Sequence, residues 1–218
     1  MSLQITQTAD NTKPTLVMTI FGVGGAGKTT LATTAPKPIF IDAEDGTKAL
    51  GARGIDVSVV SVKTWNDVRE AWTLIKSKPE YETIVIDPTG QFLEMLIESI
   101  AGGGGMDLKK WGDAKAKFRK FLWEVKQSGK NVLFIAHDDQ KSDDQSVIHA
   151  PKVSANLSTE LVNMSDIVGF MYVNNNQRYL RIQPALKIVA KDRFDTGKDV
   201  IENPNVSEII ALVHKKFE

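Results

Sequence analysis

The sequence predicts an α/β fold of three layers, in which helices cover both faces of a mostly parallel central sheet. Between residues 15 and 136, short apolar runs alternate with helical patterns, which indicates parallel strands joined by crossover helices. From residue 166 onward, strand-like runs follow one another without helices between them, so we expect antiparallel strands late in the chain. The length of 218 residues fits one domain at residues 15–218, after a polar lead-in at residues 1–14 that we expect to be flexible.

The composition excludes several kinds of protein. The 27 basic and 27 acidic side chains cancel, so a polyanion can bind only locally or where subunits line up. Cysteine is absent, which excludes disulfides and cysteine-based metal sites or nucleophiles. No apolar run approaches the roughly 18–20 residues of a membrane span, and the N-terminus lacks a signal-peptide core. We therefore expect no membrane partner and a cytoplasmic location.

The first four predicted strands are short and apolar. Residues 15–21 (TLVMTIF) lead into a glycine-rich segment, and residues 31–35 (LATTA) then continue as helix. Residues 38–42 (PIFID) and 83–87 (TIVID) both end in aspartate, and the alternating run at residues 57–62 (VSVVSV) predicts a strand between them.

The helix before the fourth strand is indicated by its first turn and by its apolar face. Thr64 can cap it, with Asp67 in place of the usual capping-box glutamate. Its apolar face consists of Val68, Ala71, Trp72 and Ile75.

Two more helices precede the fifth strand. Residues 92–100 predict a helix that ends at the tetraglycine of residues 102–105. Residues 113–127 predict a second helix, which Gly129 ends, before a strand at residues 131–136 (NVLFIA). Apolar residues of the second helix recur at i, i+3, i+4 and i+7, namely Phe118, Phe121, Leu122 and Val125.

The last third of the chain changes character. The polar residues 138–156 are expected to form a loop before a short helix at residues 157–164. The remaining elements are expected to be strands at residues 166–173, 179–182 and 186–189, with a turn at 174–177, and a closing amphipathic helix at 206–217.

Residues 22–30 read GVGGAGKTT and match the phosphate-binding pattern G-x-x-x-x-G-K-[ST]. Glycines let successive backbone N–H groups converge on phosphate oxygens, Lys28 reaches the β- and γ-phosphates, and the Thr29 hydroxyl binds Mg²⁺. The strand and helix predicted on either side argue against a chance glycine-rich turn. We therefore predict a P-loop NTPase with ATP and Mg²⁺ as cofactors. The predicted cofactor-binding residues are Gly22, Val23, Gly24, Gly25, Ala26, Gly27, Lys28, Thr29 and Thr30.

A carboxylate for the metal ion is expected at Asp87. It ends the apolar run IVID, where it can face the glycine loop. Many buried strands end in aspartate, so the residue is informative only together with the loop. The pair predicts that Thr29 and Asp87 hold the metal ion.

Three other classes of phosphate-binding protein lack support. Partition-type ATPases carry an extra lysine where this chain has Val23, and no Asn-Lys-x-Asp guanine reader is present. A small-molecule kinase needs an arginine-rich lid, and residues 138–156 contain no arginine. An ATPase of another class is therefore favoured.

Residues 41–45 read IDAED and place Glu44 just past the second strand. A carboxylate there can polarise the water that attacks the γ-phosphate. Asp42 and Asp45 compete for this role, and a solvated turn is the alternative without a function.

The motifs now resemble a family. IDAE after the second strand, IVID, and a polar residue ending the next strand resemble the RecA-like ATPase core. The ordered set GGAGKTT, IDAEDGT, TIVID, KKWGD, FIAH and KDRF is more similar still to the short phage-encoded RecA-like ATPases associated with single-strand annealing and recombination. The resemblance covers residues 15–212.

The resemblance implies roles for four further residues. Glu44 stands at the family's catalytic glutamate, and His137 stands where the family has a glutamine that senses the γ-phosphate. Lys191 and Arg193 lie where the family's basic residues reach the nucleotide of a neighbouring subunit. The alternatives are a hydrogen-bonded histidine at a strand end and a local ion pair among Lys191, Arg193 and nearby aspartates.

The resemblance also implies partners. Residues 101–111 and 138–156 would be loops that contact single-stranded DNA in a homo-oligomer, in phage recombination or repair and in the host cytoplasm. A nucleotide-switched loader or adaptor that acts on a protein partner is the alternative. A nucleotide-metabolism kinase comes third because no lid is visible.

Overall fold

The computed structural model describes residues 13–143, 146–154 and 157–218. Residues 1–12 of the predicted flexible lead-in therefore lie outside the described residues. The residues that follow them contact the far end of the chain, because Lys13 pairs with Glu218 and the Pro14 carbonyl lies 2.9 Å from Nε2 of His214. Within the described ranges, no helix is both long and apolar enough to cross a membrane.

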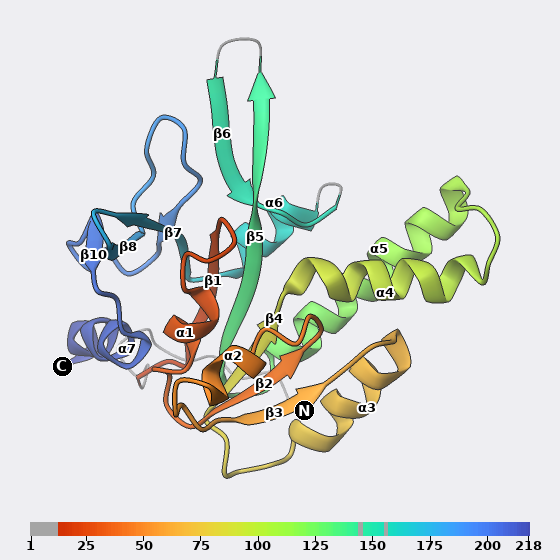
Figure 1. Cartoon of the computed structure of the whole chain (residues 1–218), viewed down its shortest axis with the longest axis horizontal. Helices are drawn as coiled ribbons and strands as arrows, with labels where there is room; N and C mark the ends of the chain where they lie inside the picture. Colours follow the sequence, from red (N-terminus) through yellow and green to blue (C-terminus); the bar gives the residue numbers. More distant parts are fainter. Residues whose placement is uncertain (1–12, 144–145, 155–156) are drawn as a thin grey trace, which may run out of the picture.

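The centre of the fold is one sheet of ten strands in the order β10-β8-β7-β1-β5-β4-β2-β3, with β6 paired to β5 and β9 paired to β7 (Figure 1). The strands from β3 to β7 along this order are parallel, and β8, β9 and β10 are antiparallel to their neighbours. The strands are β1 Val17–Gly22, β2 Pro38–Asp42, β3 Ser58–Ser61, β4 Thr83–Asp87, β5 Asn131–Asp143, β6 Ser146–Pro151, β7 Ile167–Asn174, β8 Gln177–Arg181, β9 Lys191–Asp192 and β10 Val200–Glu202.

Helices cover both faces of the sheet, as predicted. One face packs on α3, α4, α5 and α6, and the other packs on α1 and α7. Neighbouring positions of one strand point to opposite layers, since Ile84 and Ile86 pack in the first cluster and Val85 packs in the second. The helices are α1 Lys28–Ala32, α2 Lys48–Gly51, α3 Trp65–Ile75, α4 Thr89–Ala101, α5 Leu108–Lys126, α6 Leu157–Met164, α7 Val206–His214 and the 3-10 helix η2 Lys215–Phe217.

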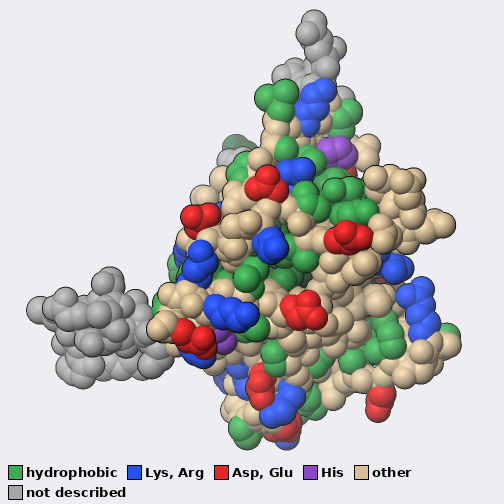
Figure 2. Space-filling model, turned by 90° about the vertical axis from the view of Figure 1, so that its left-hand side faces the viewer, with side chains coloured by type: hydrophobic (Ala, Val, Ile, Leu, Met, Phe, Trp, Pro, Cys, Tyr) green, Lys and Arg blue, Asp and Glu red, His purple; other side chains and the backbone are tan. Residues whose placement is uncertain are grey.

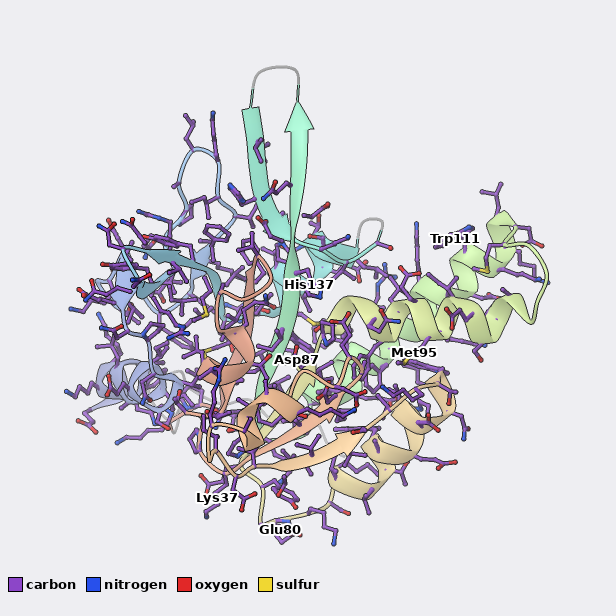
Figure 3. The ribbon with its side chains drawn as sticks, viewed as in Figure 1. Lys37, Glu80, Asp87, Met95, Trp111 and His137 are labelled. Atoms are coloured by element: carbon purple, nitrogen blue, oxygen red, sulfur yellow. The ribbon has the colours of Figure 1, made fainter. Side chains whose placement is uncertain are left out.

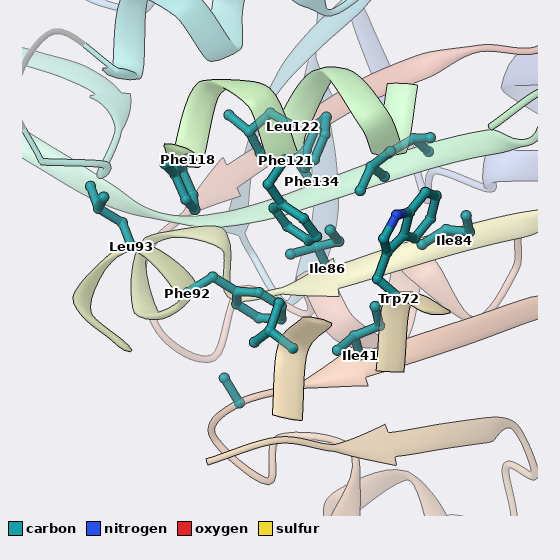
Figure 4. Close-up of a cluster of buried hydrophobic side chains, with 14 of the residues drawn as sticks. Ile41, Trp72, Ile84, Ile86, Phe92, Leu93, Phe118, Phe121, Leu122 and Phe134 are labelled. Atoms are coloured by element: carbon teal, nitrogen blue, oxygen red, sulfur yellow. The ribbon is translucent and has the colours of Figure 1, made fainter. Parts of the chain in front are cut away.

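The larger core lies between the sheet and the α3–α5 layer, and aromatic rings fill it (Figure 4). Phe92 and Phe121 stack there with ring centroids 6.4 Å apart, and Trp72 meets Phe121 edge-on. The capping box predicted at Thr64 and Asp67 is present, and it fixes the start of α3 over this core.

The prediction of a loop at residues 138–156 is wrong. β5 continues past the sheet to Asp143 and pairs with β6, so the two form a hairpin that stands away from the body (Figure 1). Residues 138–146 (DDQKSDDQS) are all polar, so they lack the apolar alternation that marks a strand in a core.

Other elements also differ from expectation. α5 begins at Leu108, where Asp107 accepts a hydrogen bond from the Lys110 N–H, so only residues 102–107 separate α4 from α5. Residues 186–189 form no strand, since Ile188 alone among them makes isolated bridges, to Ala185 and His149, and Leu186 is 97% exposed. β9 and β10 were missed because strands of two and three residues are too short to show a periodicity.

Candidate functional site

The glycine-rich segment connects the carboxyl end of β1 to α1, as predicted. Gly25 and Gly27 have φ of 78° and 97°, in the left-handed region that glycine tolerates. Gly22 is needed for a different reason, since a Cβ there would lie 2.2 Å from the carbonyl oxygen of Met171 on β7. The loop therefore depends on glycine both for its backbone shape and for close packing of two strands.

Lys28 lies at the centre of this loop with only 7% of its surface exposed. Its ammonium donates to the carbonyl oxygens of Gly22 and Val23, both at 2.9 Å. Burial lowers the pKa of Lys28, and the carboxylates of Asp87, Glu44 and Asp138 oppose that shift. The lysine is thus a buried cation surrounded by three acidic residues from β4, the β2–α2 loop and β5.

Thr29 and Asp87 meet beside Lys28. The Thr29 hydroxyl donates to Oδ2 of Asp87 at 2.7 Å. Burial raises the pKa of Asp87 to about 6, and the nearby carboxylates of Asp42 and Glu44 act in the same direction. A buried carboxylate and a hydroxyl in contact form an oxygen donor pair of the kind that Mg²⁺ prefers, so these two residues could hold the ion.

Glu44 is presented toward His137 by a turn that Asp42 holds in place. Asp42 is buried, and its carboxylate accepts hydrogen bonds from the backbone N–H groups of Glu44, Gly46 and Thr47 and from the Thr47 hydroxyl. Oε2 of Glu44 lies 3.2 Å from Nε2 of His137, which ends the parallel part of β5 beside Gly22. Figure 3 shows His137 beside β5, with Asp87 below it near the middle of the molecule.

The two competing aspartates are occupied by other contacts. The Asp42 carboxylate accepts hydrogen bonds within the turn, and Asp45 forms ion pairs with Lys48 at 3.0 Å and Lys63 at 3.1 Å. Among residues 42, 44 and 45, Glu44 is therefore the carboxylate that faces the loop and can act on a bound molecule. A cavity of about 310 Å³ opens beside Glu44 and His137 and is also lined by Gln91 and Lys152.

A second histidine–carboxylate pair lies next to the first. Nδ1 of His149 on β6 is 2.6 Å from Oδ2 of Asp138 on β5, and its ring packs on Phe170. The other carboxylate oxygen of Asp138 is buried without a hydrogen-bond partner among the described residues. Sequence reasoning missed this pair because it took both residues to lie in one loop.

Two arginines near the loop were also missed. Arg53 and Arg178 line a cavity of about 300 Å³ together with Gly27, Lys28 and Thr30. No motif marks them, and Arg178 lies on a strand far along the chain, so only the tertiary structure brings them to the loop.

Lys191 and Arg193 lie at the opposite edge of the sheet, next to the start of β1. The Lys191 ammonium donates to the carbonyl oxygens of Val162, Asn163 and Ser165 at the end of α6. Arg193 donates to Oδ1 of Asp166 at 2.6 Å. Within this chain both residues bind locally, and neither is close to the chain's own glycine loop.

Part of each segment predicted to contact DNA belongs to a helix or a strand rather than to a loop. Trp111 and Lys110 belong to the first turn of α5, and the Lys110 ammonium donates to the Gly105 carbonyl oxygen at 3.0 Å. In the hairpin, the Asp138 side chain is only 2% exposed, so its charge is not presented to solvent. Positive and negative side chains are interspersed on the face shown in Figure 2, and no large patch of one sign covers it.

One known protein and one protein family are similar to this chain. SPbeta prophage-derived uncharacterized protein YorG of Bacillus subtilis (strain 168) is 24% identical over 173 residues, which cover 73% of this chain and 51% of that protein. The chain thus spans about half the length of the curated relative that it matches. The AAA domain family matches residues 15–194, which include the glycine loop, Glu44, Asp87 and His137. The chain belongs to the AAA domain family, which is part of the P-loop ATPase superfamily.

Proposed function

We propose that the chain is a Mg²⁺-dependent ATPase that couples ATP binding and hydrolysis to its assembly on single-stranded DNA, in phage recombination or repair. The observation that carries the ATPase half is the approach of Glu44, Asp87 and Thr29 around the buried Lys28. The proposed role in a phage is supported by the prophage origin of the relative. The proposed assembly on single-stranded DNA rests on the sequence resemblance.

Each residue would have one task in hydrolysis. Lys28 would exchange its bonds to the two loop carbonyls for bonds to phosphate oxygens. Glu44 would accept a proton from the attacking water, and His137 would orient Glu44 through their contact. Thr29 and Asp87 would hold Mg²⁺, which would supply positive charge to offset the charge that develops on the phosphates.

The test is the rate of ATP hydrolysis with single-stranded DNA, with double-stranded DNA and without DNA, measured together with the particle mass. We expect single-stranded DNA to raise both the rate and the mass. Lys28→Ala should remove turnover under every condition, because the phosphate-binding cation is lost. A wild-type chain without turnover in all three conditions would contradict the proposal.

A nucleotide-switched loader or adaptor is the second candidate, and the hairpin favours it. Val147 and Ile148 on β6 are 40% and 38% exposed, and Leu186 on the adjoining loop is 97% exposed. Figure 2 shows hydrophobic side chains gathered toward the hairpin. Apolar side chains suit a protein partner better than a phosphate backbone. Hydrolysis that responds to a partner protein and not to DNA would favour this candidate.

A further inference from the structure

Arg178 lies directly against the glycine loop. It is the second residue of β8 and follows the turn at Asn175 and Asn176. A Cβ placed on Gly27 would lie 2.5 Å from Nε of Arg178 and 3.0 Å from its Cδ. The β7–β8 turn thus brings a guanidinium to a loop that lies about 150 residues earlier in the sequence.

The charge around Arg178 is unbalanced. The cavity of about 300 Å³ is lined by three cations, Lys28, Arg53 and Arg178, and by no acidic residue. On its far wall, Arg53 donates to the Thr30 hydroxyl at 3.3 Å. Arg178 has no side-chain hydrogen bond or ion pair among the residues that the structure describes. Such a cavity is suited to an anionic ligand.

The position of Arg178 indicates which part of an anionic ligand it would contact. It also lines a smaller cavity of about 180 Å³ with Gly27, Thr30 and Asn203, on the side of the loop that leads away from Lys28. The cavity next to Glu44 and His137, where hydrolysis would occur, has neither Arg178 nor Gly27 in its wall. Arg178 therefore lies outside the cavity where hydrolysis would occur and next to Gly27 and Thr30, on the side of the loop away from Glu44 and His137.

We propose that Arg178 is a phosphate-binding residue, supplied by β8 of the same chain, for the part of the nucleotide that ATP and ADP share. This inference rests on the proposed function, since it needs a nucleotide in the loop. A contact that is equally strong in substrate, transition state and product changes affinity without changing the rate of the bound complex. Arg178 is thus a binding residue rather than a catalytic one.

The experiment compares Arg178→Ala with Arg181→Ala. Arg181 lies three positions later on β8, so its side chain leaves the opposite face of the strand, and it lines neither cavity. Dissociation constants for ATP and ADP are measured by equilibrium titration with Mg²⁺, and turnover is measured at saturating ATP. Thermal unfolding of both variants checks that the fold is intact.

We expect Arg178→Ala to raise the dissociation constants for ATP and ADP by about tenfold each, because one charge-assisted hydrogen bond is lost. Turnover at saturating ATP should be unchanged. Arg181→Ala should match the wild type, and Arg178→Lys should recover part of the affinity. Unchanged ADP affinity in Arg178→Ala, or a loss confined to turnover, would overturn the inference and leave the ATPase proposal standing. A wild-type chain that binds neither nucleotide would overturn both.

Discussion

The two edges of the central sheet hold their charged residues in different ways. At the carboxyl edge, Lys28 uses two of its three ammonium donors on loop carbonyls, and Asp87 has a single hydroxyl partner. At the amino edge, Lys191 uses all three donors on carbonyl oxygens at the end of α6. Asp166 there accepts from Arg193 and from the Val17 N–H.

This difference separates a site from a structural cluster. Charged groups that the chain's own atoms saturate stabilise the fold and have little left for a ligand. Charged groups that are buried with few partners cost stability, and a ligand can relieve that cost. The carboxyl edge thus has the character of a binding site. The charged residues at the amino edge instead connect α6, β7 and β9 and stabilise the fold.

The largest effect is expected at Glu44. Glu44→Gln keeps the size of the side chain and removes its ability to accept a proton, so turnover should fall by about 10²–10⁴-fold. ATP affinity should remain, because Gln can still contact His137. Steady-state hydrolysis and equilibrium binding measure the two effects.

The matched control is Asp45→Asn, one residue along the same turn. Asp45 pairs with Lys48 and Lys63, so its loss should leave turnover near the wild-type value. A Glu44→Gln variant that hydrolyses ATP normally would transfer the role of base to another residue.

A smaller effect is expected on stability at Asp87. Its folded pKa of about 6 lies above the value of about 3.9 for an exposed aspartate. The folded chain therefore binds the Asp87 proton more tightly than the unfolded chain does. This adds about 2–3 kcal/mol to the free energy of unfolding below pH 4, and the contribution is lost as the pH rises through 6. Without metal or nucleotide, Asp87→Asn should raise the free energy of unfolding by about 2 kcal/mol at pH 8 and change it little at pH 4.

Urea unfolding at the two pH values measures this difference, with Asp166→Asn as the comparison from the other edge. Asp166→Asn should destabilise the chain at pH 8, because Arg193 and the Val17 N–H lose a charged acceptor. If both substitutions lowered stability at pH 8, the contrast between the two edges would be wrong.

The smallest effect is expected at Lys191. Lys191→Met leaves three carbonyl oxygens of the α6 end without their donor and should lower the free energy of unfolding by about 1–2 kcal/mol. Turnover at saturating ATP should stay near the wild-type value if the residue serves its own chain. Lys187→Met, on an exposed lysine four residues earlier, is the control.

A different result for Lys191→Met would change the comparison between the two edges of the sheet. Turnover that fell in the assembled protein while stability stayed unchanged would favour the role predicted for Lys191 and Arg193 at a neighbour's nucleotide. The amino edge would then also belong to a site, one completed by assembly.

Local signals predicted much of this fold. The strands at residues 38–42 and 83–87 have the expected limits, because each is a short apolar run with polar or turn residues at its ends. The helix at residues 157–164 also has the expected limits. The glycine loop and Asp87 were found for a similar reason, since phosphate-binding chemistry needs particular residues at fixed spacing along one segment. Resemblance to a family, rather than spacing, suggested His137.

What the sequence by itself determined is therefore the alternation of strands and helices up to residue 136 and the residue pattern of the glycine loop, because each depends on residues close together in the chain. Only the tertiary structure decided that β5 and β6 project as a hairpin, that Arg178 reaches Gly27 and that Arg193 pairs with Asp166. Those contacts depend on strand register and crossover geometry, which bring distant segments together and leave no periodic trace in either segment.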